Sequence, residues 1–331
     1  MRSNNPGTPA TCTMSAHTPQ NEPAEFPRLA FTALVMGAFI IGFSGIMVRL
    51  SPVGPSATGF YRVGIALPVF FLAMAIEPHE RRVRRPRVYS PWMLALPGFF
   101  FGIDMAVWHW AVQFTTVSNA TLFANLAPII VTLIAWRFFG ERMNAVFLLG
   151  LALGLAGVTM LMGISFRLSS ARLLGDGLGV FTAFWYAGYQ LSMNRLRRQY
   201  STITLMAWNC AVAMVVLWLA AVCSGESFTW GPAQFGRGLA ALLTLALVCH
   251  SCGQGLIVYG LQKLPAAFSS VSLLVQPMVA TAAAWVWLGE ALSPWQVAGA
   301  GVVLCGIYLA RWGSLPNTQR KETEPHGGKT D

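Results

Sequence analysis

Charged residues are scarce in this chain. Asp, Glu, Lys and Arg make up 10% of its 331 residues, whereas hydrophobic residues make up 55%. A soluble domain of this length could not cover its surface with so few charges. The composition therefore excludes a large soluble protein and predicts a polytopic membrane protein. Nucleic acid is not expected as a partner despite the net charge of +10, because the basic residues fall in short loops between apolar runs.

Cysteines and catalytic motifs are also sparse. Five of the six cysteines lie in or beside apolar runs, which makes a disulfide framework unexpected. Cys249 and Cys252 bracket His250, but no second ligand pair completes a metal site, so no metal or cofactor is expected. No phosphate-binding loop, dinucleotide fingerprint or serine-hydrolase elbow occurs between a strand and a helix. ATP-driven transport would therefore need another subunit.

Long apolar runs are what the chain does contain. A helix needs about 20 apolar residues to cross a bilayer, and ten runs qualify, of which the sixth and the tenth are the shortest. The first is too long for a signal-peptide core and is expected to be retained. The ten are Leu29–Val48, Ala57–Ile76, Trp92–Val112, Ser118–Phe138, Ala145–Met162, Leu178–Met193, Ile203–Val222, Leu239–Leu261, Ala267–Leu288 and Trp295–Ala310.

The tails and the basic residues predict an orientation. Residues 1–28 are polar and proline-rich and are expected to be disordered, as a cytoplasmic tail; Met14 is an alternative start. Residues 312–331 form a second polar tail. If the N-terminus is cytoplasmic, 17 of the 22 Lys and Arg residues lie inside, four lie outside and Arg62 is within a span. This bias predicts a multi-pass protein of the cell membrane with both termini in the cytoplasm.

The chain contains an internal duplication. The stretch Ser118–Met143 recurs 149 residues later as Ala267–Leu292, with no gap between matching positions. A proline, a tryptophan and a Gly-Glu pair in one register are hard to match by chance, so we interpret them as markers of a repeat. The marker residues are Pro128 and Pro277, Trp136 and Trp285, Gly140 and Gly289, and Glu141 and Glu290.

The repeat predicts the fold class. Each copy holds five spans, over residues 29–163 and 173–311. Because five is odd, the second copy must be upside down in the membrane relative to the first. We therefore expect an all-α integral membrane protein with ten transmembrane helices in two inverted five-helix repeats. Inverted repeats around a central site are a recurring plan of secondary transporters.

The order of motifs resembles a known family. The first half contains FYRVGIALPVF and MAVWHWAVQFTTVSNATLFANLAPIIVTLIAWRFFGER, and the second GDGLGVFTAFWYAGYQLSMNRL and GLQKLPAAFSSVSLLVQPMVATAAAWVWLGEAL. This pattern resembles the drug/metabolite transporter superfamily in its ten-helix EamA-type form. The resemblance implies transport, often export, of a small metabolite. It identifies neither the substrate nor whether the chain acts as a monomer or a homodimer.

Asp104 and His250 are ionisable residues near the centres of the third and eighth spans, which are repeat equivalents. A carboxylate at that depth costs roughly 3 kcal/mol to insert. We expect Asp104, His250 and Gln254 to line a wet central cavity and to bind substrate or exchange protons. The alternative is structural: Asp104 bonds between helices, and His250 bonds a neighbouring serine or carbonyl.

Asn125 and Gln276 lie within a turn of the mid-span prolines Pro128 and Pro277. A proline removes one helical hydrogen bond and frees a carbonyl group, and such breaks often line the cavity of a transporter. We therefore add both amides to the candidate site. A kink that serves only helix packing is the alternative.

Three further candidates have open alternatives. Arg62 is expected to extend to water at the outer face, or else to bind a substrate carboxylate or Asp104. His109 does not share a helix face with Asp104, and it stands between Trp108 and Trp110, as in an interfacial aromatic belt. Gln190, with Trp185 and Tyr186, either lines the cavity or packs between helices.

Together these residues predict a secondary transporter of a small polar or amphipathic metabolite that works by alternating access. Its expected partners are the lipid bilayer and the small-molecule substrate, and protons as well if transport is proton-coupled. The first alternative is a membrane-embedded enzyme in which Asp104, His109 and His250 surround a metal or a lipid head group. The second is a receptor or assembly partner that does not transport.

Overall fold

A computed structural model describes residues 27–83, 91–114, 123–162, 170–197, 199–288 and 293–314. Within these ranges the regular elements are helices, apart from a single β-bridge between Val83 and Tyr200. The all-helical class predicted from the sequence is therefore confirmed. The two tails and the second Gly-Glu marker, Gly289 and Glu290, lie outside the described residues.

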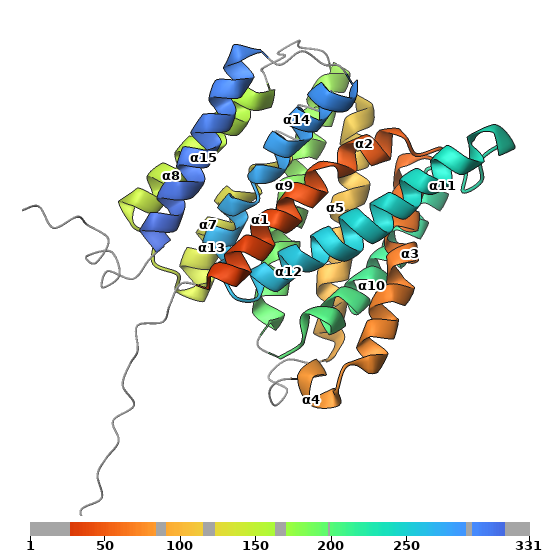
Figure 1. Ribbon diagram of the computed structural model, residues 1–331, viewed down its shortest axis with the longest axis horizontal. Helices are drawn as coiled ribbons and strands as arrows, with labels where there is room; N and C mark the ends of the chain where they lie inside the picture. The colour runs from red at the N-terminus through yellow and green to blue at the C-terminus, as the bar shows by residue number, and fades with distance from the viewer. Residues whose placement is uncertain are drawn as a thin grey trace, which may run out of the picture. The chain divides into compact units, whose positions relative to one another are not determined.

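In the first half of the chain, the described helices correspond to the first five predicted spans (Figure 1). The first span breaks at Phe43 into two helices, and a short helix and a 3₁₀ turn precede the third. The elements are α1 (Arg28–Gly42), α2 (Ser44–Arg49), α3 (Pro55–Ile76), α4 (His79–Arg82), η1 (Pro91–Leu94), α5 (Ala95–Phe114), α7 (Ala127–Phe139) and α8 (Ala145–Met162).

The second half repeats the order of five spans, and its third span contains a π-helical segment in the middle. The sixth span is a helix of 27 residues and longer than expected, because hydropathy marks the hydrocarbon depth and not the ends of a helix. The elements are α9 (Ser170–Leu196), α10 (Thr202–Cys223), η2 (Pro232–Gln234), α11 (Phe235–Leu243), the π-helix η3 (Thr244–Gln254), α12 (Gly255–Leu261), α13 (Ala266–Ser272), α14 (Val275–Leu288) and α15 (Pro294–Ser314).

The outward faces of the helices are apolar. Ile76 is 84% exposed and Phe138 is 69% exposed, and large side chains of the same kind cover other helices. Such a surface suits lipid and not water. Six stretches of the described chain are also long and apolar enough to cross a bilayer: Arg28–Arg49, Pro55–Ile76, Thr202–Cys223, Pro232–Leu261, Ala266–Trp287 and Pro294–Ser314.

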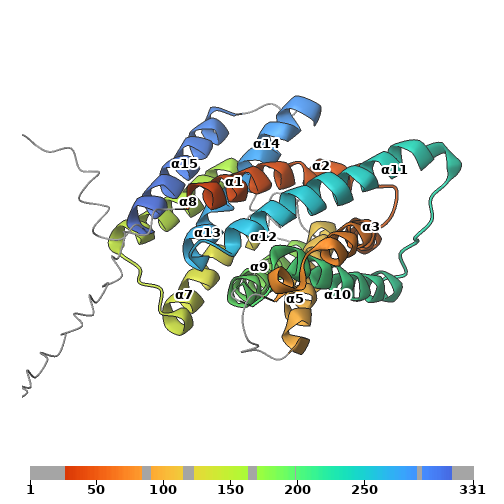
Figure 2. The same ribbon diagram turned by 60° about the horizontal axis from the view of Figure 1, so that its bottom comes forward.

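The contacts between α8 and α15, which lie side by side (Figures 1 and 2), show the inverted symmetry of the two repeats. A Cβ atom built on Gly157 would lie 2.7 Å from the Gly299 carbonyl oxygen, and one built on Gly306 would lie 2.7 Å from that of Gly150. Gly299 and Gly306 are the repeat equivalents of Gly150 and Gly157. Gly157 therefore contacts the equivalent of Gly150, and Gly150 contacts the equivalent of Gly157. This reciprocal pattern is that of two antiparallel helices related by a two-fold axis. Small residues permit such close crossings in membranes.

Both proline markers lie in the first turn of the helix that follows a break within a span. In the fourth span α7 begins at Ala127, with Pro128 in its first turn. In the ninth span the chain leaves the helix after Ser272 and resumes it at Val275, just before Pro277. A proline suits this position, because the first helical N–H groups have no partner within the helix. The predicted breaks therefore mark helix starts in the middle of the membrane.

The first Gly-Glu marker has a structural role. Gly140 ends α7 with a φ of 69°, a left-handed conformation that favours glycine. Glu141 then accepts hydrogen bonds from the backbone N–H groups of Ala266 (2.8 Å) and Ala267 (3.2 Å) at the start of α13. A carboxylate at a helix N-terminus satisfies free N–H groups and opposes the helix dipole. The Gly-Glu marker thus connects the end of α7, in the first repeat, to the start of α13, in the second repeat.

The start of the first helix, α1, and the end of the last helix, α15, lie at the same end of the bundle. The Arg311 guanidinium, near the end of α15, stacks over the Phe31 ring, near the start of α1, at 5.3 Å from its centroid. An even number of spans between two tails requires this arrangement. Which side of the membrane they occupy stays a prediction.

The glycine crossing yields a stability test. Replacing Gly306 by Ala places a Cβ atom 2.5 Å from the Gly154 nitrogen, a contact that is relieved only if α8 and α15 separate. We expect Gly306→Ala to lose roughly 1–3 kcal/mol of stability, the usual cost of overpacking. The measurement is the thermal unfolding midpoint of the purified protein in detergent.

Gly301→Ala is the matched control. Gly301 lies on the same helix and has no neighbouring atom within 4 Å of a built Cβ. Alanine is about 1 kcal/mol better than glycine inside a helix, so this variant should be as stable as the parent or more so. Equal destabilisation by the two substitutions would contradict the tight crossing.

Candidate functional site

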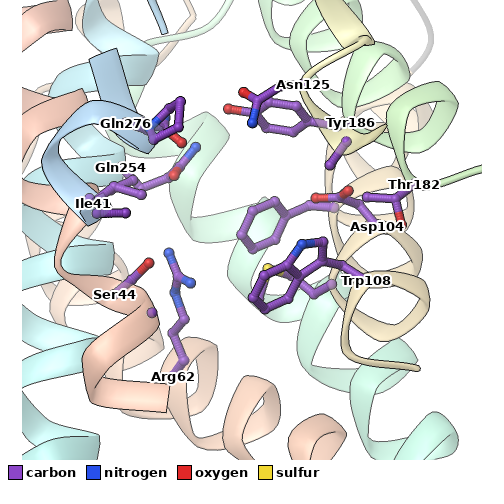
Figure 3. Close-up of a pocket in the computed structure, with 17 residues that line it drawn as sticks. Ile41, Ser44, Arg62, Asp104, Trp108, Asn125, Thr182, Tyr186, Gln254 and Gln276 are labelled. Atoms are coloured by element: carbon purple, nitrogen blue, oxygen red, sulfur yellow. The ribbon is translucent and has the colours of Figure 1, made fainter. Parts of the chain in front are cut away.

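A cavity of about 210 Å³ lies between the two repeats (Figure 3). Its lining comes from α1, α2, α3 and α5, from the turn before α7, and from α9, η3 and α14. A space of this volume is large enough for several water molecules. The cavity can therefore hold a small metabolite together with some of its hydration.

Arg62 provides the positive charge of the cavity. It lies on α3, is 5% exposed and lines the cavity, into which Figure 3 shows its guanidinium pointing. The expectation that Arg62 extends to water at the outer face is therefore wrong. A buried guanidinium needs polar surroundings, and here the cavity is the nearest polar space.

Asp104 provides the negative charge from the other side. It lies on α5, is 7% exposed and faces the cavity across from Arg62 (Figure 3). Within the described chain the two side chains form no direct ion pair, although each is close enough to feel the charge of the other. Opposite charges held apart across one space can bind a molecule that carries both signs.

Gln254 is held in place by an aromatic cluster. Its Nε2 donates a hydrogen bond of 2.7 Å to the Tyr189 hydroxyl, which is wholly buried. The Tyr189 ring packs against Phe101 at 5.0 Å and is stacked on Tyr186 at 6.2 Å between ring centroids. These contacts fix the orientation of the Gln254 amide at the cavity wall.

The amides next to the broken helices also face the cavity. Asn125 lies in the turn before α7, and Gln276 in the first turn of α14. Both line the cavity on the side away from Arg62 (Figure 3). Thr182 and Ser44 complete the polar lining. The cavity thus has one charged residue on each of two walls, and elsewhere uncharged polar groups lie among apolar lining residues.

His250 does not line the cavity. Its ring is wholly buried, and its Nε2 lies 3.2 Å from the Cys210 sulfur on α10. Phe101, 5.5 Å away between ring centroids, stands beside it and itself lines the cavity. The expectation that His250 shares the cavity with Asp104 and Gln254 is therefore corrected: the ring is packed between Cys210 and Phe101, and its Nδ1 has no hydrogen-bond partner among the described residues.

His109 and Gln190 also lie away from the cavity lining. His109 is 2% exposed, so it does not belong to an interfacial belt. Its ring packs against Trp108, and its two nitrogens have no hydrogen-bond partner in the described part of the chain. Gln190 is 1% exposed, and its amide likewise has no partner among the described residues. Both are packed between helices.

The repeat symmetry could have identified further lining residues. Phe101 is the equivalent of His250 and Met105 of Gln254, at the same offset of 149 residues, and both line the cavity. The equivalent of Asp104 is Gly253, where a built Cβ would meet Ile40 at 3.0 Å. Close packing of α1 on the eighth span therefore leaves room for an acid in one repeat only.

The geometry argues against the enzyme alternative. Asp104 faces the cavity, whereas His109 and His250 are packed elsewhere. In the described ranges no group of three or more His, Cys, Asp or Glu side chains could hold a metal ion. The three residues therefore do not converge on one reacting centre.

Accessibility to a water-soluble thiol reagent tests this cavity. In a background with the native cysteines replaced, we expect Gln276→Cys and Asn125→Cys to react at least tenfold faster than His250→Cys, because only the first two positions face the cavity. Gel-shift labelling of intact membranes measures the rates. Equal rates at the three positions would contradict the assignment.

Relatives and solved structures share this architecture. The chain is 25% identical over 283 residues to a "Probable terminal-alkyne amino-acid exporter" of Streptantibioticus cattleyicolor, covering 85% of this chain and 92% of that one. It is 24% identical over 295 residues to the "Threonine/homoserine exporter RhtA" of Escherichia coli K12, covering 88% and 92%. A crystal structure titled only as that of a protein superposes with a TM-score of 0.71 at 18% identity, covering 85% of this chain and 98% of that chain.

The two halves also match one family profile separately. Residues 28–163 and residues 173–312 each match the EamA-like transporter family. Two matches in tandem confirm the internal duplication, and together they span most of the chain. The family is one of membrane transporters and not of enzymes, which agrees with the separation of Asp104, His109 and His250. The chain belongs to the EamA-like transporter family.

Proposed function

We propose that this protein is a secondary transporter that exports a small amino-acid-like zwitterion by alternating access. The observation that carries the proposal is the placement of Arg62 and Asp104 on different walls of one cavity without a direct ion pair. A zwitterion carries a carboxylate and an ammonium a short distance apart, and it can satisfy both walls at once.

The guanidinium of Arg62 binds the carboxylate, and the carboxylate of Asp104 binds the ammonium. Each contact is a charge-assisted hydrogen bond, which is stronger than a neutral one. A ligand with only one of the two charges leaves the other wall unpaired in a partly dehydrated space, which is costly. The pair of walls therefore selects against simple amines and simple acids.

The remaining lining suits a short substrate side chain. Phe101, Met105 and Trp108 offer apolar surface, whereas Asn125, Gln254 and Gln276 offer hydrogen-bonding groups. A cavity of about 210 Å³ is large enough for a small amino acid. The names of two relatives, an amino-acid exporter and a threonine/homoserine exporter, support the same class of substrate and the outward direction.

The inverted repeats support alternating access. Two halves that share one fold can exchange conformations, which opens the cavity first to one side and then to the other. The helix starts at Ala127 and Val275 give each half a break beside the cavity. We propose that the termini are cytoplasmic, in line with the bias of Lys and Arg towards that side.

Counterflow in proteoliposomes tests the zwitterion. We expect exchange of threonine or another small amino acid, and little exchange of propylamine or propionate, which each lack one charge. Asp104→Asn and Arg62→Gln should raise the apparent KM about tenfold or more, because truncating a charged partner costs about 1.5–3 kcal/mol. Counterflow of propylamine at the same rate as that of amino acids would contradict a site that binds both charges.

Matched control variants remove charges outside the cavity. Glu80 and Arg81 lie on the short helix α4, where Glu80 is exposed, and neither lines the cavity. Glu80→Gln and Arg81→Gln should keep the apparent KM within twofold of the parent. Protein levels and elution profiles should match across the four variants, so that a loss of transport reports on binding and not on folding.

Proton coupling is a separable part of the proposal. The Asp104 carboxylate cannot bind a proton and an ammonium at the same time, and this competition is sufficient for antiport. We expect an inward proton gradient to drive export in the parent, whereas Asp104→Asn abolishes the gradient effect and retains slow counterflow at high substrate concentration. A gradient effect that survives in Asp104→Asn would exclude this residue as the coupling group.

A further inference from the structure

A second cavity, of about 290 Å³, lies away from the substrate cavity between η1, α5, α7 and α9. Its lining is almost wholly apolar and includes Leu96, Phe100, Ile134 and Leu191. The one hydroxyl in the lining, that of Ser192, already donates a hydrogen bond to the Tyr189 carbonyl oxygen at 2.9 Å. This groove therefore offers nothing to a polar metabolite, but its shape and lining suit an acyl chain.

The groove has a basic end. Arg195 lines it from the last turn of α9, and its guanidinium lies 5.2 Å from the centroid of the Phe139 ring at the end of α7. Arg195 is exposed, although Phe139 covers one face of its guanidinium. Arg137 is exposed at the same end and stacks at 5.3 Å over Phe138. Arg195 thus places a positive charge in the lining where the apolar groove meets the end of the helices, whereas Arg137 lies outside the lining.

The width of the groove depends on one small residue. Gly188 lies in the lining on α9, and a Cβ built on it would meet the Phe100 ring at 2.8 Å. The absence of a side chain lets α5 approach α9 while the Phe100 ring forms one wall. An apolar space of this size does not hold water well, because water needs polar partners. In a bilayer, lipid chains are the apolar molecules at hand.

We propose that this groove binds one anionic phospholipid, with an acyl chain along Leu96 and Leu191 and the phosphate at Arg195. Charge complementarity carries the choice of lipid: an arginine binds a phosphate through paired N–H groups, and basic residues at a membrane surface attract anionic head groups. By the predicted orientation, this end faces the cytoplasmic leaflet. The site is independent of the substrate cavity, so it does not rest on the proposed transport activity.

Native mass spectrometry of the full chain tests the site. The purified protein is exchanged into micelles that contain equal amounts of phosphatidylglycerol and phosphatidylethanolamine, and retained lipid is counted. We expect the parent to retain one phosphatidylglycerol in preference to phosphatidylethanolamine. Arg195→Gln should reduce that retention at least fivefold. Arg137→Gln is the matched control, because it removes an exposed arginine that also stacks on a ring but does not line the groove.

A second variant tests the binding of the acyl chain, and its result does not depend on whether Arg195→Gln folds correctly. Leu96→Trp fills the groove and leaves Arg195 in place, so it should also reduce lipid retention at least fivefold. Equal retention of the two lipids by the parent would overturn the proposal. So would unchanged retention in Leu96→Trp, a loss as large in Arg137→Gln as in Arg195→Gln, or displacement of the lipid by millimolar threonine, which would make the groove a substrate site.

Discussion

The cost of placing a charge at the depth of the hydrocarbon is the constraint on which this structure depends. Arg62 and Asp104 each lie within a span and are almost wholly buried. Neither can face lipid, because an ionised group there loses its hydration without compensation. The helices must therefore enclose a polar space, and among the residues that the structure describes its lining comes from seven of the spans.

Helix breaks and close crossings make that space possible. Asn125 and Gln276 reach the cavity because α7 and α14 start in the middle of the membrane, where a proline is tolerated in the first turn. Backbone groups freed at such starts are acceptable only beside protein or water. Outside the cavity lining, the glycines of α8 and α15 allow a crossing close enough to hold the halves together. Glu141 adds a polar link between them at the start of α13.

Much of this could be predicted from the pattern of residues. The register of Pro128 with Pro277 predicted the duplication, and five spans for each copy required inversion. Depth alone placed Asp104 near the centre. The errors at the site concern direction: Arg62 points inward and not to the surface, and His250 turns towards Cys210 behind Phe101. A single residue's depth follows from its position in the chain, but the face it presents depends on which helices pack beside it.

The amino-acid sequence by itself determined the membrane class, the ten spans, the repeat and its inversion, because hydrophobic length and register are properties of the chain alone. Only the tertiary structure decided which polar residues meet. Arg62 and Asp104 are 42 positions apart and come together with Gln254 and Gln276, from the other repeat, through the crossing of α3, α5, η3 and α14. Such convergence depends on the rotation of each helix about its own axis, which is set by its neighbours and not by its own hydropathy.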